Sequence, residues 1–275
     1  EASPEHQALM QRVAWHYHTT LLNTPQALAY LEKRGLKNSL ALEKFRIGFV
    51  DKSLSKTMPP RRSKDGDRVR EQLQEIGTHY ESGSERFQGC IVIPIFSGEK
   101  IVGLYGRRII DNWHCPTHLY LPGPHRGIFN PDCLKSPEII LCEAILDAVS
   151  AWIMGFENVT ASYGTHGLTR DHLTLFREAQ VKKVFLAYDA DQAGRSGAAH
   201  ASERLAVQGI HPWSIALPEE GMDVNDLLIK HNGAASGEFA KALAAAVLLD
   251  SSSEVASFSS GSSKAELIEK ETSAA

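Results

Sequence analysis

Long apolar runs are absent from this sequence. Its 275 residues contain no stretch of about 18 apolar residues, the length that a membrane-spanning helix needs. The first residues, EASPEHQALMQRV, also lack the charged and then apolar order of a secretory signal. These absences predict a soluble, cytoplasmic protein with no membrane partner. An initiator methionine is missing too, which suggests a fragment of a longer protein, although processing would leave the same end.

Cysteine and net charge are both low. The four cysteines include no CxxC pair, so the sequence predicts neither a disulfide framework nor a zinc ribbon. They are Cys90, Cys115, Cys133 and Cys142. A net charge of -4 excludes a protein that is basic overall, yet residues 52–70 hold seven Lys or Arg against two Asp. That local excess predicts a basic patch able to bind phosphates.

Residues 1–136 are expected to form a smaller α+β unit. The first 45 residues have helical patterning, and residues 51–67 combine Pro, Ser, Asp and Gly in a way that is typical of an exposed loop. The runs CIVIPIF and KIVGLYGRRII, joined by a short turn at Gly98, predict a β-hairpin. Residues 111–136 form a connection rich in Pro and Gly.

From residue 137 the pattern changes to strands that alternate with helices. EIILC, NVTASYG, KKVFLAYD and PWSIAL have the composition of short strands, and helical segments lie between them. This alternation predicts an α/β fold with a parallel sheet flanked by helices over residues 137–232. A C-terminal helix is expected over residues 233–249, and the Ser-rich residues 250–275 are expected to form a disordered tail.

Acidic residues follow three of the predicted strands. Glu143 comes after EIILC, Asp189 and Asp191 come after KKVFLAY, and Asp223 comes after PWSIALPEEGM. Ligands bind at the carboxyl edge of such sheets, where neighbouring strands lie about 4.8 Å apart, so these carboxylates are expected to converge. A divalent cation would relieve the repulsion between them, and hard oxygen donors favour Mg²⁺ or Mn²⁺.

The alternative is that each acid only caps a helix or carries a solvated charge. Asp and Glu are common in the first turn of helices, and for Asp147 or Asp226 alone this interpretation is as good as a metal ligand. It suits the set of Glu143, Asp189 and Asp191 poorly, because all three fall at the edge where ligands bind. Alternate residues leave a strand on the same side, so Asp189 and Asp191 are expected to meet one cation.

With their neighbours, these acids resemble a known family. The segments CEAILDAVSAWIMGFENVTASYGTHGLT, LAYDADQAGRSG and GMDVNDLL are similar to the TOPRIM domain shared by bacterial-type DNA primases, topoisomerases and some nucleases. The resemblance covers about residues 138–232 and implies a Mg²⁺ or Mn²⁺ site. Its catalytic residues would be Glu143, Asp189 and Asp191, and its metal ligands would be Glu143, Asp147, Asp189, Asp191 and Asp223. Gly194 would let the next helix begin beside the site.

Two residues depart from the TOPRIM pattern. Ala144 stands where the family usually has Gly after the first Glu, a small change in the first turn of a helix. Asn225 stands where bacterial primases commonly have a second acid in the last motif. An amide still accepts a hydrogen bond from a metal-bound water, but it carries no negative charge. The number of metal ions is therefore open.

The upstream residues indicate which TOPRIM protein this chain resembles. YHTTLLNTPQALAYLEKRGL, FRIGFV, RFQGCIVIPIF and KIVGLYGRRI are similar, in this order, to the N-terminal part of the bacterial primase catalytic core, over about residues 16–110. That part lines a basic groove for the template, which implies nucleic-acid contacts by Arg86, Arg107, Arg108 and Arg126. Arg107 and Arg108 are adjacent on a predicted strand and face opposite sides, so only one is expected to contact nucleic acid. A solvated surface charge is the alternative for each arginine.

His118 lies where bacterial primases carry the Lys of a Pro-Lys-Tyr-Leu motif. A neutral His offers a hydrogen bond in place of a fixed charge, so nucleotide handling is expected to differ, with His125 and Arg126 restoring some positive character. Cys115 and His118 also have metal-like spacing, but the His and Cys residues around them are irregularly spaced, so zinc is not favoured.

The resemblance implies a DNA primase, a nucleotidyltransferase that builds short RNA primers on a single-stranded DNA template from ribonucleoside triphosphates during DNA replication. Topoisomerases fit poorly because they need a strand-cleaving Tyr in a separate domain. A metal-dependent nuclease and a non-catalytic nucleic-acid-binding module are the alternatives. Primases usually add a zinc-binding domain and a helicase-docking domain, and neither is visible in the sequence. A replicative helicase is thus an open partner, and the chain would be an excised core or a reduced primase of a plasmid, phage or other mobile element.

Overall fold

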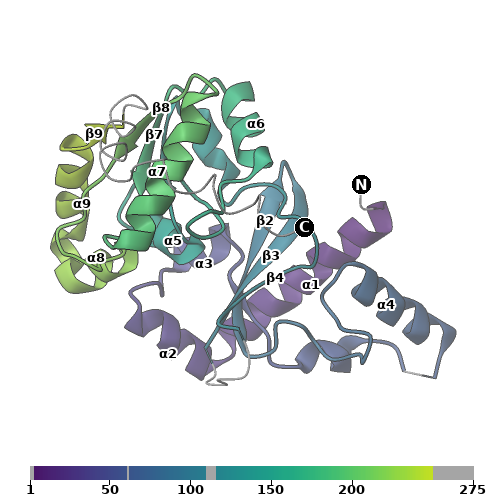
Figure 1. Ribbon diagram of the computed structural model, residues 1–275. Helices are drawn as coiled ribbons and strands as arrows, with labels where there is room; N and C mark the ends of the chain where they lie inside the picture. Colours follow the sequence, from purple (N-terminus) through teal and green to yellow (C-terminus); the bar gives the residue numbers. More distant parts are fainter. Residues whose placement is uncertain (1–2, 61, 110–115, 250–275) are drawn as a thin grey trace, which may run out of the picture.

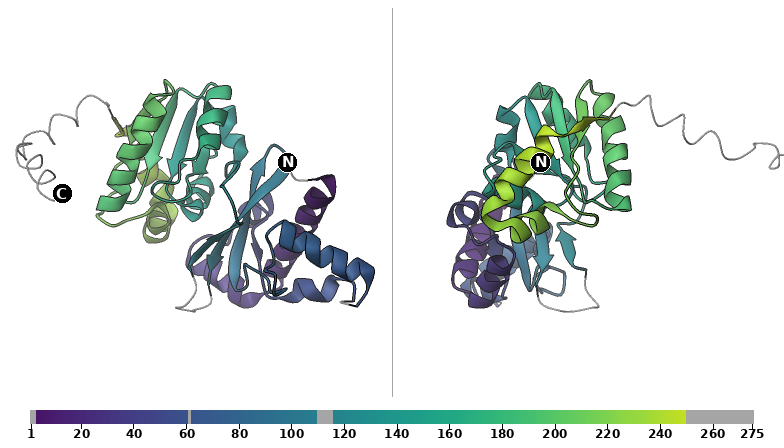
Figure 2. Two further views of the ribbon diagram at one scale, coloured as in Figure 1. Left: turned by 45° about the vertical axis from the view of Figure 1, so that its right-hand side comes forward. Right: turned by 90° about the vertical axis from the view of Figure 1, so that its left-hand side faces the viewer.

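The computed structural model describes residues 3–60, 62–109 and 116–249, which form two units, each built on one sheet. Figure 1 and Figure 2 show them side by side, with the N-terminal unit in purple and blue and the C-terminal unit in green. The predicted tail, residues 250–275, lies outside the described residues. Within the described ranges no helix is both long and apolar enough to cross a membrane.

The N-terminal unit packs helices around a four-stranded sheet of order β1-β2-β3-β4 in which every neighbouring pair is antiparallel. Its elements are α1 (Pro4–Leu22), α2 (Pro25–Lys33), α3 (Ser39–Lys44), β1 (Gly48–Phe49), the short 3₁₀ helix η1 (Ser53–Thr57), α4 (Lys64–Glu75), β2 (Cys90–Ser97), β3 (Lys100–Arg108) and β4 (His118–Tyr120). The predicted hairpin is formed by β2 and β3 and is confirmed.

Residues 51–67 are not the single exposed loop that their composition predicts. Residues 53–57 form η1, whose Leu54 side chain is buried against the core around α1. Helix α4 begins at Lys64, and the side chain of Ser63 caps it. The prediction was wrong because the apolar side chains that anchor the segment, Leu54 and the partly buried Met58, were outweighed by the turn-forming residues around them.

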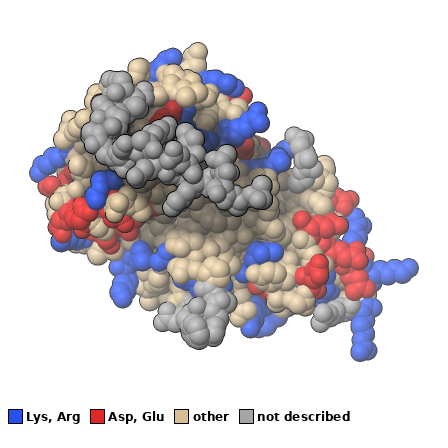
Figure 3. Space-filling view, in the orientation of Figure 1, with Lys and Arg blue, Asp and Glu red and all other residues tan. Residues whose placement is uncertain are grey.

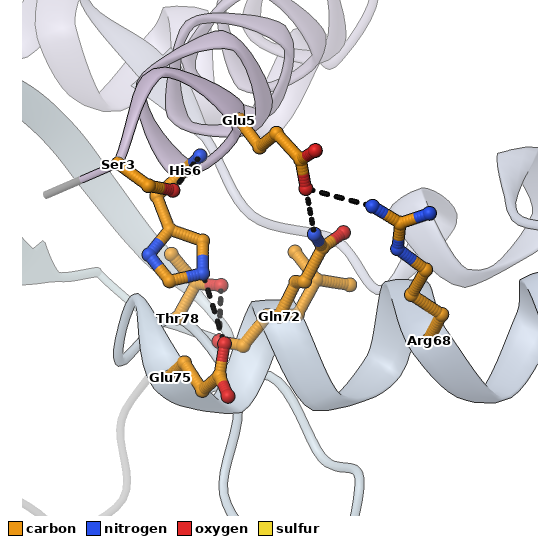
Figure 4. Close-up of polar contacts among 8 residues, drawn as sticks. Ser3, Glu5, His6, Arg68, Gln72, Glu75 and Thr78 are labelled. Atoms are coloured by element: carbon orange, nitrogen blue, oxygen red, sulfur yellow. Dashed lines mark hydrogen bonds and ion pairs between the residues drawn. The ribbon is translucent and has the colours of Figure 1, made fainter.

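Polar contacts hold α4 against α1, as Figure 4 shows. Glu5 Oε2 accepts a hydrogen bond from Arg68 Nη2 at 2.7 Å, and His6 Nε2 lies 2.9 Å from Glu75 Oε2. Figure 3 likewise shows acidic side chains beside the basic ones over this part of the surface. The described basic side chains of residues 52–70 therefore lie on a surface of mixed sign, and phosphate binding by this stretch stays a prediction.

The C-terminal unit is a sheet of order β6-β5-β7-β8-β9, parallel except for β9. Its elements, with the 3₁₀ helix that precedes them, are η2 (Pro131–Lys135), β5 (Glu138–Cys142), α5 (Ile145–Ile153), β6 (Val159–Ala161), α6 (Arg170–Glu178), β7 (Lys183–Ala187), α7 (Gln192–Ala206), β8 (His211–Ser214), α8 (Val224–His231), the 3₁₀ helix η3 (Asn232–Ala234), α9 (Ala235–Ala244) and β9 (Val247–Leu248). The predicted parallel sheet flanked by helices is confirmed.

Both faces of this sheet are covered. Leu141 and Leu186 pack in a cluster with residues of α6 and α7, whereas Ile140 and Phe185 pack in a cluster with residues of α5, α8 and α9. Successive side chains of a strand point to opposite faces, so β5 and β7 are apolar after their first residues, Glu138 and Lys183. Burial on both faces holds β5 and β7 in place, and it therefore also fixes the position of the residues that follow the last residue of each strand.

The C-terminal helix expected over residues 233–249 is shorter than predicted. Helix α9 ends at Ala244, and Val247 and Leu248 form β9, which pairs antiparallel with β8. Leu248 lies opposite Trp213 in this ladder. The Ala-rich composition predicts that the helix continues to residue 249. The side chains of Val247 and Leu248 are instead accommodated in a strand, which extends the sheet at β8.

The two units share one hydrophobic core. Phe45 of α3 packs on Phe129 with ring centroids 4.6 Å apart and meets Trp152 of α5 edge-on at 5.3 Å. The same cluster runs from Leu31 of α2 to Phe239 of α9. Burial of these large rings fixes the orientation of one unit on the other. The boundaries proposed at residues 136 and 232 stay predictions.

Candidate functional site

The carboxyl edge of the C-terminal sheet gathers the predicted acids. Strands β5 and β7 are parallel neighbours, with Cys142 paired with Ala187 at their last residues. Glu143 follows β5 at once, and Asp189 follows β7 by two residues. Since both strands end at the same edge, these carboxylates leave the sheet side by side, as the sequence predicts.

A loop contact brings the third acidic segment to the same place. Ala190 N donates to the carbonyl of Met222 at 2.9 Å, and Gly221 N donates to the carbonyl of Ala190 at 2.8 Å. These two bonds tie the segment of Asp189 to the segment of Asp223. The juxtaposition therefore rests on backbone pairing beyond the sheet.

The reason that the sequence offers for the spacing of Asp189 and Asp191 is wrong. Strand β7 ends at Ala187, so strand alternation does not extend to the two aspartates. Asp191 is instead the N-cap of α7, and its Oδ1 accepts a hydrogen bond from Gly194 N at 2.7 Å. Asp189 lies in the turn before this helix, and the cap fixes the turn.

Gly194 is required by the tightness of that turn. A Cβ atom at this position would lie 2.1 Å from the carbonyl oxygen of Asp189, far inside van der Waals contact. Gly197, one turn later, approaches Thr165 equally closely, at 2.4 Å from its Cγ2. The two glycines let α7 start directly against the acidic edge, which confirms the expectation for Gly194.

Burial and mutual repulsion raise the pKa values of acids in this group. Burial raises the pKa of Asp189 to about 7, and the charges of Glu143, Asp223, Asp191 and Asp226 add to the effect. Burial also raises the pKa of Asp223, although its carboxylate caps α8 by accepting from Asp226 N at 2.6 Å. The folded chain thus holds negative charges together at a cost in free energy, an arrangement that is common at functional sites.

Asp147 forms the inner wall of this group. Its side chain is 5% exposed, and burial together with the charges of Asp223 and Asp189 raises its pKa well above the usual value. Its Oδ1 accepts a hydrogen bond from Asn225 N at 3.3 Å. All five acids predicted as ligands therefore interact within one electrostatic group, with Asp147 the least accessible of them.

Glu143 offers one free oxygen. Its Oε1 accepts a hydrogen bond of 2.6 Å from the hydroxyl of Thr165, while its Oε2 is buried and meets no hydrogen-bond partner within the described residues. A buried acceptor without a partner is costly unless a ligand or ion satisfies it. Thr165 was missed by the sequence analysis, although its place just after the strand at residues 159–161 puts a hydroxyl at the same edge.

The acids fit a metal that arrives with other ligands better than a protein-only cage. In the described part of the chain, no three His, Cys, Asp or Glu side chains stand together at the spacing of a metal centre. Mg²⁺ in proteins commonly takes one or two carboxylates and completes its octahedron with water and phosphate oxygens. The hard oxygen donors and the unpartnered Glu143 Oε2 suit that mode of binding.

Basic and polar side chains of the N-terminal unit face the acids. Arg34, the C-cap of α2, donates from Nη1 to Asn225 Oδ1 at 3.0 Å, and its charge counteracts the rise in the pKa of Asp223. Arg107 Nη1 donates to His118 Nε2 at 2.6 Å across β3 and β4. The acidic group therefore has the guanidinium of Arg34 beside it, and the charges of Arg34 and Arg107 both act on His118. Arg34 was not singled out from the sequence.

His118 is neutral in this arrangement. Burial and then the charges of Arg107 and Arg34 lower its pKa. Because Arg107 can only donate, Nε2 of His118 must accept, which leaves the proton on Nδ1 to be donated to the Tyr105 hydroxyl 3.0 Å away. The predicted replacement of a fixed charge by a hydrogen-bonding ring is thus confirmed, with Arg107 supplying the charge beside it.

The other predicted arginines lie elsewhere. Arg108 donates to the carbonyls of Gln88 and Pro116, so it turns away from Arg107, as adjacent strand residues should. Arg86 donates to the carbonyl of Gly77 and lies over the ring of Tyr80, 4.3 Å from its centroid. Arg126 is exposed in the loop after β4. Arg107 and Arg34 both act on His118, and nucleic-acid contact by each of the four predicted arginines stays a prediction.

The zinc alternative gains no support from the described residues. Cys115 lies outside them, both ring nitrogens of His118 are engaged, and Cys133 is fully buried. Burial raises the pKa of the Cys133 thiol to about 12, the opposite of what metal ligation needs.

Two family models match the chain in the order of its two units. Residues 16–131 match the model described as the N-terminal domain of the DNA primase catalytic core, and residues 140–228 match a model described as Toprim-like. The first match ends just before β5, and the second contains every predicted acidic ligand. The comparison therefore supports both halves of the resemblance seen in the sequence.

Curated relatives and solved structures agree. The chain is 29% identical to a DNA primase of Helicobacter pylori over 81% of its own length, and 27% identical to one of Staphylococcus aureus over 85%. It spans about two fifths of the length of these relatives, 41% and 40%.

The fold is similar to that of the Aquifex aeolicus primase, with a TM-score of 0.77 at 25% identity over 90% of this chain and 63% of that one. A DnaG primase catalytic domain bound to ssDNA gives 0.72 at 26% identity over 88% of this chain and 79% of that one. The comparisons thus support a DnaG-like primase catalytic core in which an N-terminal primase domain, residues 16–131, precedes a Toprim-like domain, residues 140–228.

Proposed function

We propose that this chain is the catalytic core of a DNA primase, a nucleotidyltransferase that makes short RNA primers on single-stranded DNA with Mg²⁺ or Mn²⁺ as cofactor. The observation that carries the proposal is the convergence of five acids at one sheet edge, with the guanidinium of Arg34 beside Asp223 and Asn225. Polymerisation of nucleotides needs this combination, because two anionic substrates must meet at one place.

Each acid has a distinct part in the proposal. Glu143, through its unpartnered Oε2, would accept the proton of the primer 3′-hydroxyl. Asp189, Asp191 and Asp223 would hold the metal. The buried Asp147 would add to the negative electrostatic potential at the metal. A metal bound there would neutralise charge on the triphosphate and align in-line attack.

The N-terminal unit would supply the template side. Arg107, which donates to His118, and Arg86, Arg108 and Arg126 would meet template phosphates. Such contacts make binding fall steeply with salt. A related structure is described as bound to ssDNA, which supports a single-stranded template here. Ribonucleoside triphosphates and a replicative helicase are proposed partners of the whole protein.

The test is a primer-synthesis assay with single-stranded DNA, labelled ribonucleotides and Mg²⁺. The double variant D189N/D191N should make no primers while keeping its circular dichroism spectrum. Glu220→Gln is the matched control, because this exposed carboxylate lies three residues before Asp223. Primer synthesis retained by the double variant would refute the assignment.

The same assay separates the two alternatives. A nuclease would shorten the DNA in the presence of Mg²⁺, whereas a primase lengthens a ribonucleotide product. A binding module would retain the DNA without any metal-dependent turnover. Either outcome for the wild-type chain would replace the proposal.

A further inference from the structure

Asn225 is a buried joint between the two units. It is 0% exposed and follows Asp223 in the first turn of α8. Its Oδ1 accepts from Arg34 Nη1 at 3.0 Å, and its Nδ2 donates to the carbonyl of Arg34 at 2.8 Å and to Ser150 Oγ at 3.0 Å. Its backbone N–H donates to Asp147. The side chain thus connects the end of α2 with α5 and α8.

Only an amide satisfies these partners. The position needs one acceptor for a guanidinium and two N–H donors, for a carbonyl and a hydroxyl, which is the inventory of an Asn side chain. A carboxylate would turn an oxygen onto the carbonyl of Arg34 and leave that carbonyl unpaired. Because Asn225 is 0% exposed and both its Oδ1 and its Nδ2 are hydrogen-bonded within the protein, the side chain does not face a metal-bound water.

The joint fixes the place of a positive charge. Arg34 is held by its side chain and by its backbone carbonyl, and its guanidinium also lies 5.7 Å from the centroid of the Tyr30 ring. The guanidinium therefore lies at Asn225, a residue two positions after Asp223 whose backbone N–H donates to Asp147. Arg34 therefore stands at the border of the acidic group, on the Asp223 side.

We propose that Asn225 is a positioning residue rather than a metal ligand. It holds Arg34 as a fixed cation beside Asp223, so that the guanidinium offsets part of the negative charge of the acidic group and weakens its hold on a divalent ion. The inference rests on the metal-dependent site of the proposed function. According to this inference, Arg34 controls the affinity of the chain for the metal and the number of metal ions that it binds.

The test is a Mn²⁺ titration of the metal-free protein, followed by the electron paramagnetic resonance signal of free Mn²⁺. Arg34→Gln should bind Mn²⁺ about fivefold more tightly or bind one more ion, since a positive charge several ångströms from a dication is removed. Arg34→Lys keeps the charge and should match the wild type. Lys33→Gln, which removes an exposed charge at the adjacent position, is the control for general electrostatics.

A second variant keeps the test decisive if Arg34→Gln does not fold. Asn225→Ala releases the guanidinium without removing it and should also tighten Mn²⁺ binding. Equal Mn²⁺ affinity in Arg34→Gln and Lys33→Gln, or in Asn225→Ala and the wild type, would overturn the inference and make the joint purely structural.

The two hypotheses fail separately. A wild-type chain that binds Mn²⁺ but makes no primers refutes the proposed function alone. If the wild-type chain makes primers but Arg34→Gln binds Mn²⁺ with the same affinity as the wild type, only the inference is refuted.

Discussion

Removal of the charge of Asp189 should stabilise the metal-free chain at neutral and alkaline pH. Burial and the neighbouring carboxylates raise the pKa of Asp189 from 3.8 to about 7, so ionisation of this group costs free energy in the folded chain. The full shift corresponds to about 4 kcal/mol, and solvent screening of this partly exposed side chain reduces the expected effect to about 2 kcal/mol. The variant Asp189→Asn avoids that cost.

The contribution of Asp189 to the free energy of unfolding depends on pH. Between about pH 4 and pH 7 the folded chain retains a proton on Asp189 that the unfolded chain has lost, so this group makes stability fall as pH rises through that window. The stability of Asp189→Asn relative to the wild type should therefore be near zero at pH 4 and should level off above pH 7.

Urea unfolding in the presence of a chelator, at several pH values from 4 to 8, measures this difference. Glu220→Gln, an exposed carboxylate near the same edge, should show no comparable gain. If Asp189→Asn is no more stable than the wild type at pH 8, or if its advantage does not grow with pH, the acids do not repel one another as the structure indicates. Added Mg²⁺ should stabilise the wild type more than the variant.

Two further predictions concern the neighbours of the acids. Gly194→Ala should destabilise the chain by about 2–3 kcal/mol in thermal or urea unfolding, because its Cβ would meet the carbonyl of Asp189. Gly237→Ala, in open space within α9, should be neutral or stabilising, and equal effects would contradict the argument from the tight turn. Thr165→Val removes the donor to Glu143 and should slow primer synthesis about tenfold, for a loss of about 1.4 kcal/mol. Thr165→Ser should restore the rate, and an unchanged rate in the valine variant would show that this hydrogen bond does not orient the glutamate.

Much of the fold was predictable because its signals are local. Apolar runs such as EIILC and KKVFLAYD, separated by helical segments, identify buried parallel strands by composition alone. The acids directly after them are placed at one edge by the rule that parallel strands share a direction. Errors arose where local signals competed, as in residues 51–67, where turn-forming residues masked Leu54, and in residues 233–249, where helical composition masked β9.

The contacts that complete the site were not predictable because they join distant segments. Ala190 meets Met222 only because their loops leave the same edge of the sheet, and Thr165 reaches Glu143 only because β6 lies next to β5. Strand order is set by how the helices pack on both faces, and no periodicity in the sequence records it.

The sequence by itself predicted the candidate residues of the site: the acids, their order, and their position after buried strands. The tertiary structure alone decided what opposes and orients them, since Arg34 and Asn225 are 191 residues apart in the chain yet share hydrogen bonds across the two units. Local composition specifies an element and its end. Which residues contact the end of a helix or strand depends on the hydrophobic core that both units share. That core forms only when the whole chain has folded.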